Sequence, residues 1–260
     1  MAAIRPIIKS TTHPAYRAAL ALLRKKERAA AGCTLLEGSR LIGEAVAAGA
    51  AVERLFVAGD DLPAAVAGLA RVAVTVPARL LARLSSLETP PDAVAVAPMP
   101  RARSLPALLA TARRVLVLDR VQDPGNVGTL LRSADALAVD AVLALRGTCD
   151  LANAKVVRAS MGSLWRVPFA EMLDGGALLA ELRAAGFTQW AASPRGRPLQ
   201  PGLVAPARLA WWLGAEGQGL ASELERGCDE RLTIPMRPAV ESLNVAIAAA
   251  ICLFATLPRG

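Results

Sequence analysis

The sequence contains a single histidine, His13, and only four cysteines, and this scarcity removes several kinds of active site. A Ser–His or Cys–His mechanism would have to use His13, which lies close to the N-terminus. The cysteines are far apart along the chain, and without further histidines a zinc site would need unusual ligands. We therefore predict no metal site and interpret the cysteines as small buried apolar side chains.

The sequence also lacks an apolar run long enough to cross a membrane. The apolar stretch near its C-terminus, residues 243–257, has fifteen residues, fewer than the roughly 18 typical of a spanning helix. The first ten residues, MAAIRPIIKS, lack the apolar segment of a signal peptide. We therefore expect a cytoplasmic protein with no membrane contact.

Charge is unevenly distributed along the chain, which has a net charge of +8. Residues 1–40 hold eight of the Lys and Arg residues against two Glu residues. Four of these basic residues gather in the stretch LLRKKERAA: Arg24, Lys25, Lys26 and Arg28. Such a cluster favours a partner rich in phosphate, RNA above all, but it is also typical of a solvated helix face.

Residues 1–97 alternate short apolar runs with helical patterns, which predicts a small α/β domain. We expect helices over residues 15–31 and 39–48, the second with Ser39 as N-cap. The segments CTLLEG, VERLFV, VAVTV and AVAVA are predicted strands. Residues 98–112, which begin with a Pro- and Arg-rich stretch, are the predicted linker.

Residues 113–260 have a different pattern, in which strands alternate with helices. The predicted strands are VLVLD, AVLAL, WRVPF, TQWAAS and LAWWLG, and helices are expected over residues 129–138 and 153–162. This order predicts a parallel sheet covered by helices on both faces.

The first stretch with functional residue types is DPGNVGTLLRSADAL, residues 123–137. A helix that begins here would offer free backbone N–H groups to an anion, and Asn126 could orient the turn. Arg132 lies near enough to reach a bound phosphate or ribose. Simple turn chemistry, with Arg132 paired to Asp135, explains the same residues.

The second stretch, LGAEGQGL, places three glycines in six residues after a very apolar strand. Glycines let the backbone approach a ligand closely, and Glu216 lies among them. The spacing of Gly214, Gly217 and Gly219 does not match the dinucleotide-binding fingerprint. A tight connection with an incidental glutamate is the alternative.

The third stretch is IPMRPAVESLNVA, residues 234–246. Ser242 is a candidate N-cap for the terminal helix. We expect Asn244 to be buried on this apolar helix, so its amide needs a partner, either a neighbouring loop or a ligand. A structural amide bonded to backbone is the alternative.

Taken together and in this order, the three stretches resemble the SpoU (TrmH) family of RNA 2′-O-ribose methyltransferases, within the SPOUT class. LLEGSRLIGEA, residues 35–45, is similar to the signature of the extra N-terminal domain found in some members, and residues 154–169 are similar to the family's middle segment. Many members carry Asn where this chain has Ala215.

The resemblance implies an L30e-like N-terminal domain that binds RNA and a C-terminal parallel-sheet domain with a deep trefoil knot. It implies S-adenosylmethionine as methyl donor and a homodimer with a shared pocket. By residue-to-residue match, the catalytic polar centre would be Asn126, Arg132, Glu216, Ser242 and Asn244. The donor would contact Gly214, Ile234, Met236 and Leu243.

The function implied by this resemblance is methylation of a ribose 2′-hydroxyl, in ribosomal RNA and specifically a guanosine of 23S rRNA. We interpret Arg132 as a residue that holds a phosphate and stabilises the developing alkoxide, because a guanidinium is a poor general base. A tRNA 2′-O-methyltransferase and a non-catalytic RNA-binding protein of the same fold remain open. A Rossmann-type enzyme fits less well, because the first stretch has only two glycines.

Overall fold

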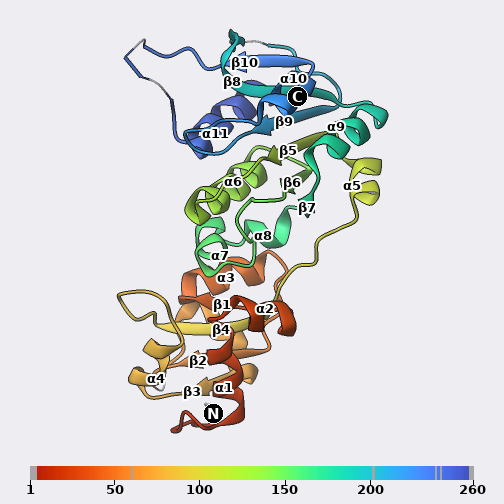
Figure 1. Ribbon diagram of the computed structural model, residues 1–260. Helices are drawn as coiled ribbons and strands as arrows, with labels where there is room; N and C mark the ends of the chain where they lie inside the picture. Colours follow the sequence, from red (N-terminus) through yellow and green to blue (C-terminus); the bar gives the residue numbers. More distant parts are fainter. Residues whose placement is uncertain (1–4, 60, 201–202, 238, 241, 258–260) are drawn as a thin grey trace. The chain divides into compact units, whose positions relative to one another are not determined.

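The computed structural model describes residues 5–59, 61–200, 203–237, 239–240 and 242–257 (Figure 1). The chain forms two compact units. The first comprises Met1–Pro100 and Ala152–Arg166, and the second comprises Arg101–Leu151 and Val167–Gly260. The chain therefore passes between the units three times, at residues 100/101, 151/152 and 166/167.

A four-stranded sheet forms the centre of the first unit, in the order β1-β4-β2-β3. Its strands are β1 (Cys33–Glu37), β2 (Arg54–Val57), β3 (Ala73–Thr75) and β4 (Ala93–Pro98). β4 pairs antiparallel with β1 and β2, and β2 pairs parallel with β3. All four predicted strands of this region are therefore confirmed.

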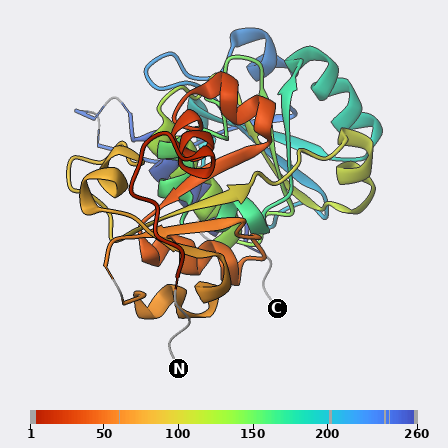
Figure 2. The same cartoon turned by 90° about the horizontal axis from the view of Figure 1, so that it is seen from below.

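Helices cover both faces of this sheet. Helix α1 (Pro14–Ala21) lies on one side, and α3 (Ser39–Ala47) lies on the other with the 3-10 helix η1 (Ala64–Val72) (Figure 2). The buried Tyr16 of α1 donates a hydrogen bond of 2.9 Å to a carbonyl of α4 (Ala78–Arg83), which joins the two helices. Successive residues of each strand therefore point alternately into the two layers between the sheet and its helices.

The predicted helix over residues 15–31 is wrong in its continuity, because α1 ends at Ala21 and α2 spans Lys25–Ala31. Arg28 explains the break. Its guanidinium is buried and donates to the carbonyls of Leu22 and Leu23, 3.1 Å each, at the end of α1. Arg28 is thus a structural residue, and its burial contradicts the exposed RNA contact predicted for it.

The N-cap predicted for α3 is also wrong. Gly38 occupies that position with a φ of 99°, a conformation that favours glycine. Ser39 is the first helical residue, and its hydroxyl donates to the carboxylate of Asp92 (2.5 Å).

Two short helices from the middle of the chain complete the first unit: α7 (Ala154–Ser160) and α8 (Ser163–Arg166). Arg158 of α7 donates to the buried carboxylate of Glu37, at the end of β1, over 2.8 Å. Glu37 also accepts hydrogen bonds from the hydroxyls of Ser85 and Ser86. An acidic group without water contact is thus neutralised and hydrogen-bonded, as burial demands.

A six-stranded parallel sheet forms the centre of the second unit, in the order β10-β8-β9-β5-β6-β7. Its strands are β5 (Arg114–Leu118), β6 (Ala141–Leu145), β7 (Phe169–Leu173), β8 (Thr188–Pro198), β9 (Leu209–Leu213) and β10 (Glu230–Thr233). The predicted α/β class with a parallel sheet is therefore confirmed. The segment WRVPF is only partly strand, because α8 contains its first two residues.

Helices cover both faces of this sheet as well. On one face, α5 (Leu105–Thr111), α9 (Gly175–Ala184) and α10 (Ser222–Gly227) enclose an apolar core that includes Trp212. Helix α5 lies within the predicted linker, and its residues Leu108 and Leu109 are part of this core.

Helices α6 (Pro124–Ala136) and α11 (Val245–Ala255) pack against each other on the other face. The buried Arg114 joins their carboxyl ends. Its guanidinium donates to the carbonyl of Leu137 at 2.6 Å and to the carbonyl of Leu253 at 3.0 Å. Within the described residues, no helix has the length and apolar character needed to cross a membrane.

Candidate active site

The three stretches singled out in the sequence follow or adjoin strand ends of the six-stranded sheet. The first follows β5 and forms the start of α6, whereas the second follows its neighbour β9. Because these strands are parallel, both segments lie at the carboxyl edge of the sheet, where α/β proteins bind their ligands. The third stretch leads into α11, which packs beside α6.

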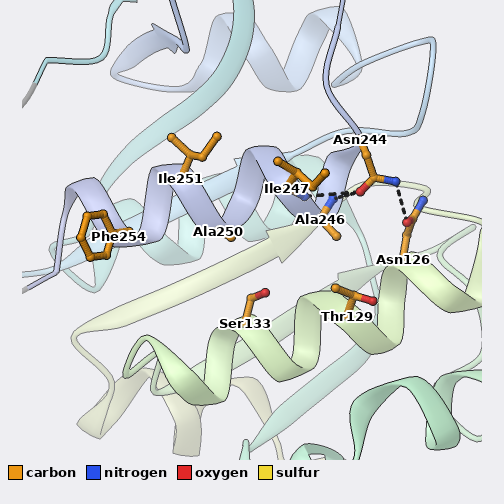
Figure 3. A pocket seen from close by; sticks show the side chains of 9 residues that line it. All are labelled: Asn126, Thr129, Ser133, Asn244, Ala246, Ile247, Ala250, Ile251 and Phe254. Carbon is orange, nitrogen blue, oxygen red and sulfur yellow. Dashed lines mark hydrogen bonds between the residues drawn. The ribbon is translucent and has the colours of Figure 1, made fainter.

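A chain of hydrogen bonds joins all three stretches. The side-chain N–H of Asn126 donates to Glu216 over 2.7 Å, and that of Asn244 donates to the amide oxygen of Asn126 over 2.9 Å (Figure 3). We call Asn126, Glu216 and Asn244 the amide bridge. The first turn of α6 thus supplies the partner that Asn244 was expected to need.

Asn244 also begins the terminal helix. Its amide oxygen accepts from the backbone N–H groups of Ala246 (2.9 Å) and Ile247 (3.3 Å), so Asn244 and not Ser242 is the N-cap of α11. Asn244 is exposed, which contradicts the expected burial. The helix is apolar all round in sequence, yet Ile247 and Phe254 remain 54% and 70% exposed.

A cavity of about 380 Å³ lies beside the amide bridge. We call it the glycine-loop cavity. Glu216 and Ser242 line it. So do all four residues predicted to contact a donor: Gly214, Ile234, Met236 and Leu243. A Cβ on Gly214 would lie 1.9 Å from the backbone of Gly219 and Leu220, so the loop closes only with glycine at this position.

Asp119 holds the far end of the glycine loop, a role that the sequence analysis missed. Its carboxylate is buried and accepts the backbone N–H of Ala221 at 3.0 Å. It also pairs with Arg120, whose Nε lies 2.9 Å away, and this ion pair raises the pKa of Arg120. The sequence feature that could have indicated this role is the acidic residue that directly follows the buried strand in VLVLD.

Arg132 does not join this cluster. It is exposed on α6 and makes no ion pair with any described residue, Asp135 included. It also does not line the glycine-loop cavity. The structure therefore brings together four of the five residues predicted for the polar centre and leaves Arg132 apart.

Two of the four cysteines and the single histidine have structural surroundings. Burial is the main cause that raises the pKa of Cys228 and Cys252 to about 12, so both thiols stay protonated near neutral pH. His13 caps α1, where its Nδ1 accepts from the N–H of Ala15. Among the described residues, no group of three or more metal-ligating side chains gathers.

Two family models match the chain. The SpoU rRNA Methylase family matches residues 113–254, which is more than half of the chain, and the MRM3-like substrate binding domain matches residues 14–95.

The chain belongs to the SpoU rRNA methylase family.

A full-length relative agrees. The chain is 35% identical over 233 residues to the 23S rRNA (guanosine(2553)-2′-O)-methyltransferase RlmP of Bacillus subtilis, covering 88% of this chain and 90% of that protein.

Two solved structures have the same fold. The SpoU methyltransferase AviRb of Streptomyces viridochromogenes, in complex with the cofactor AdoMet, superposes with a TM-score of 0.79 at 29% identity and covers 94% of this chain and 96% of that one. An AdoMet-bound rRNA methyltransferase of Sinorhizobium meliloti gives 0.81 at 26% identity, with 96% of both chains covered.

The glycine-loop cavity of this SpoU family member suits such a cofactor. Its volume falls in the usual range for small-molecule sites. Apolar side chains such as Ile234 and Leu243 offer a surface for an adenine ring, and the carboxylates of Glu216 and Glu225 suit a cationic sulfonium and ammonium group.

Proposed function

We propose that this protein transfers a methyl group from S-adenosylmethionine to a ribose 2′-hydroxyl of ribosomal RNA, with a guanosine of 23S rRNA as the target. The observation that carries the proposal is the amide bridge beside the glycine-loop cavity. It fixes a row of polar groups where a donor in the cavity would meet a nucleotide. The relatedness to RlmP and AviRb supports both the donor and the type of RNA.

Each part of the site has a distinct task in this proposal. The bound donor supplies an already activated methyl group, so the chain has mainly to align it with the ribose oxygen. The loop at Gly214, with Ile234, Met236 and Leu243, holds the donor. The amide bridge keeps the starts of α6 and α11 fixed around the reacting atoms, and Ser242 lines the same cavity.

Arg132 stabilises the developing alkoxide and holds a phosphate, and we propose that it does so in a homodimer. It is exposed on α6 and is not part of the wall of its own cavity, so the cavity of a second copy is its natural target. The groove between α6 and α11 supports this assembly, because Ile247, Ile251 and Phe254 leave apolar surface exposed along it (Figure 3).

Two further parts of the proposal concern topology and location. We infer that the chain around the glycine-loop cavity is tied in a trefoil knot, on the strength of family membership. We also infer that the protein acts in the cytoplasm, where its RNA substrate would be made and folded.

The experiment is methyl transfer from radiolabelled S-adenosylmethionine to unmodified 23S rRNA transcribed in vitro. We expect incorporation by the wild type at one nucleotide, mapped as a ribose methylation. Arg132→Ala should lower turnover by more than about 100-fold and leave donor affinity within about twofold, because the proposed contacts of Arg132 are with the phosphate and alkoxide of the RNA and not with the donor.

Mixed dimers test the shared site. Arg132→Ala and Gly214→Val are each expected to be inactive, and mixing the two should restore roughly a quarter of the wild-type activity. Lack of restoration, with dimers formed, would place Arg132 and the donor in the same chain. Labelling of tRNA and not rRNA would show that the substrate is tRNA. Donor binding without any methyl transfer would favour a non-catalytic protein.

A further inference from the structure

Strand β8 carries a large irregularity next to the glycine-loop cavity. In its pairing with β10, Arg231 lies opposite Ala191, whereas the next residue, Leu232, lies opposite Arg197. Residues 192–196 therefore leave the regular ladder as a bulge. This bulge falls at the carboxyl edge of the sheet, because Ala191 is the last β8 residue paired with β9.

The bulge is held in a fixed shape. A Cβ on Gly196 would lie 2.5 Å from the backbone of Arg231, so only glycine lets the two strands approach this closely. The buried Ser193 donates its hydroxyl to Glu225 and accepts the backbone N–H of Arg195 at 3.2 Å. Arg195 is thus presented from a rigid support.

Arg195 lines two neighbouring hollows. One is the glycine-loop cavity, where it is the single cation among the described lining residues. The other is an open cleft, here called the arginine cleft, formed by residues 195–197 and 229–231. Positive charge therefore continues from the proposed methylation site into the adjoining cleft.

The acidic residues of the arginine cleft do not neutralise this charge. Glu230 pairs with Arg197 over 2.8 Å, and Asp229 pairs with Arg183 over 3.8 Å. Arg195 and Arg231 are exposed, and within the described part of the chain neither has a carboxylate partner. Two guanidinium groups thus face solvent on either side of a close strand contact.

We propose that Arg195 and Arg231 bind backbone phosphates of the RNA on one side of the target nucleotide, with Arg195 nearest to the reacting ribose. A guanidinium matches phosphate oxygens well, and consecutive phosphates suit two cations that lead out of a cavity. The carboxylate of the methyl donor would occupy only one of them. This inference rests on the proposed function and names the surface that carries the substrate.

The test measures RNA and donor binding separately for Arg195→Ala and Arg231→Ala. Arg113→Ala is the matched control, because Arg113 is exposed in the same unit but precedes β5, at the opposite edge of the sheet. The probe is unmodified 23S rRNA transcribed in vitro, in filter binding between about 50 and 300 mM salt, and calorimetry gives donor affinity.

We expect each cleft variant to bind RNA about five- to tenfold more weakly and to lower the steepness of the log–log salt dependence by about 0.7–0.9, the value for one phosphate contact. Donor affinity should stay within about twofold, and Arg113→Ala should match the wild type. Arg195→Lys should recover part of the affinity, since charge persists without the fork.

Two results would overturn the assignment. One is unchanged RNA affinity and salt dependence in Arg195→Ala. The other is loss of donor affinity alone, which would make Arg195 a ligand of the donor carboxylate. Methyl transfer by the wild type is measured in the same preparations. If the wild type is active and both variants bind RNA normally, the phosphate-site proposal is wrong and the proposed function stands.

Discussion

Asn244 performs two tasks with one amide group. Its oxygen caps α11 by accepting from two backbone N–H groups, and its nitrogen donates to Asn126 in the amide bridge. Aspartate could perform the first task but not the second, because a carboxylate has no N–H to donate. The two tasks can therefore be separated experimentally.

We predict that Asn244→Asp keeps nearly wild-type stability and loses methyl transfer. Asp is as good an N-cap as Asn, so the free energy of unfolding should change by less than about 0.5 kcal/mol. Turnover should fall by more than about tenfold, because the bridge is broken and a second carboxylate then lies near Glu216. Denaturant titration and single-turnover kinetics give the two quantities.

Asn244→Ala is the matched variant that removes both tasks. It should lower the free energy of unfolding by about 1 kcal/mol in addition to the loss of turnover. Wild-type turnover in both variants would show that the bridge has no part in the reaction.

Residue types in the sequence indicated which polar side chains lie together better than they indicated the geometry of the contacts. Asn244, Asn126 and Glu216 were identified from polar residues within apolar or glycine-rich segments. Ser242 was assigned as N-cap because capping preferences depend on residue type, whereas the cap itself depends on which residue leaves helical φ/ψ. That choice is made two residues later, at a position fixed by the contact with α6.

At the scale of elements, α6 and α11 are joined at both ends. Asn244 and Asn126 connect their amino ends, and Arg114 connects their carboxyl ends. A guanidinium at two helix C-termini is favourable, because free carbonyls and the negative end of each helix dipole face it. Burial lowers the pKa of Arg114, and the nearby carboxylate of Asp140 opposes this shift.

We predict that Arg114→Met destabilises the second unit by about 3 kcal/mol. The side-chain volume is nearly kept, but two carbonyls in a buried setting lose their donor. Equilibrium denaturation measures the loss. Arg113→Met, one residue away and exposed, should change stability by less than about 0.5 kcal/mol; equal losses in both would mean that the contacts of Arg114 with the two carbonyls add nothing to stability.

The start of α6 shows why element boundaries were harder to predict than element types. The sequence predicts this helix from about residue 129, because the glycines and asparagine of DPGNVG are typical of a loop. Asp123 in fact caps the helix, and Pro124 occupies its first turn, where a missing N–H costs nothing. The same Asp–Pro pair would have indicated the correct start.

At the scale of the whole molecule, surface charge is divided between the two units. Arg24, Lys25 and Lys26 lie exposed at the start of α2 in the first unit. The arginine cleft belongs to the second unit. An RNA substrate large enough to reach both would be bound through two separate sets of phosphates.

We predict that Lys25→Ala/Lys26→Ala weakens binding of 23S rRNA and flattens its salt dependence by about 0.7–0.9 per lost phosphate contact, without a change in melting temperature. Arg28→Ala, in the same helix, should instead lower the melting temperature, because the carbonyls of Leu22 and Leu23 at the end of α1 lose their buried guanidinium donor. Filter binding and thermal melting separate the two; a flattened salt dependence in Arg28→Ala with normal melting would refute this division.

Composition along the chain predicts where one domain ends and the next begins. It does not reveal that residues 152–166, which lie between segments of the second unit, belong to the first. The proline- and arginine-rich stretch after β4 marks one passage between the units. Residues 152–166 carry no compositional signal of their own, yet they pack with the first unit through Arg158 and Glu37. Only a contact between distant residues reveals such an arrangement, and one sequence contains no direct record of it.

This interleaving limits how the protein can be recombined with its relatives. A chimera that replaces residues 1–100 alone would leave the native Arg158 facing a foreign surface, and the glycine at 162, whose missing Cβ allows contact with Glu44, would meet an unmatched helix. An intact first unit can therefore be exchanged only if residues 1–100 and 152–166 are replaced together.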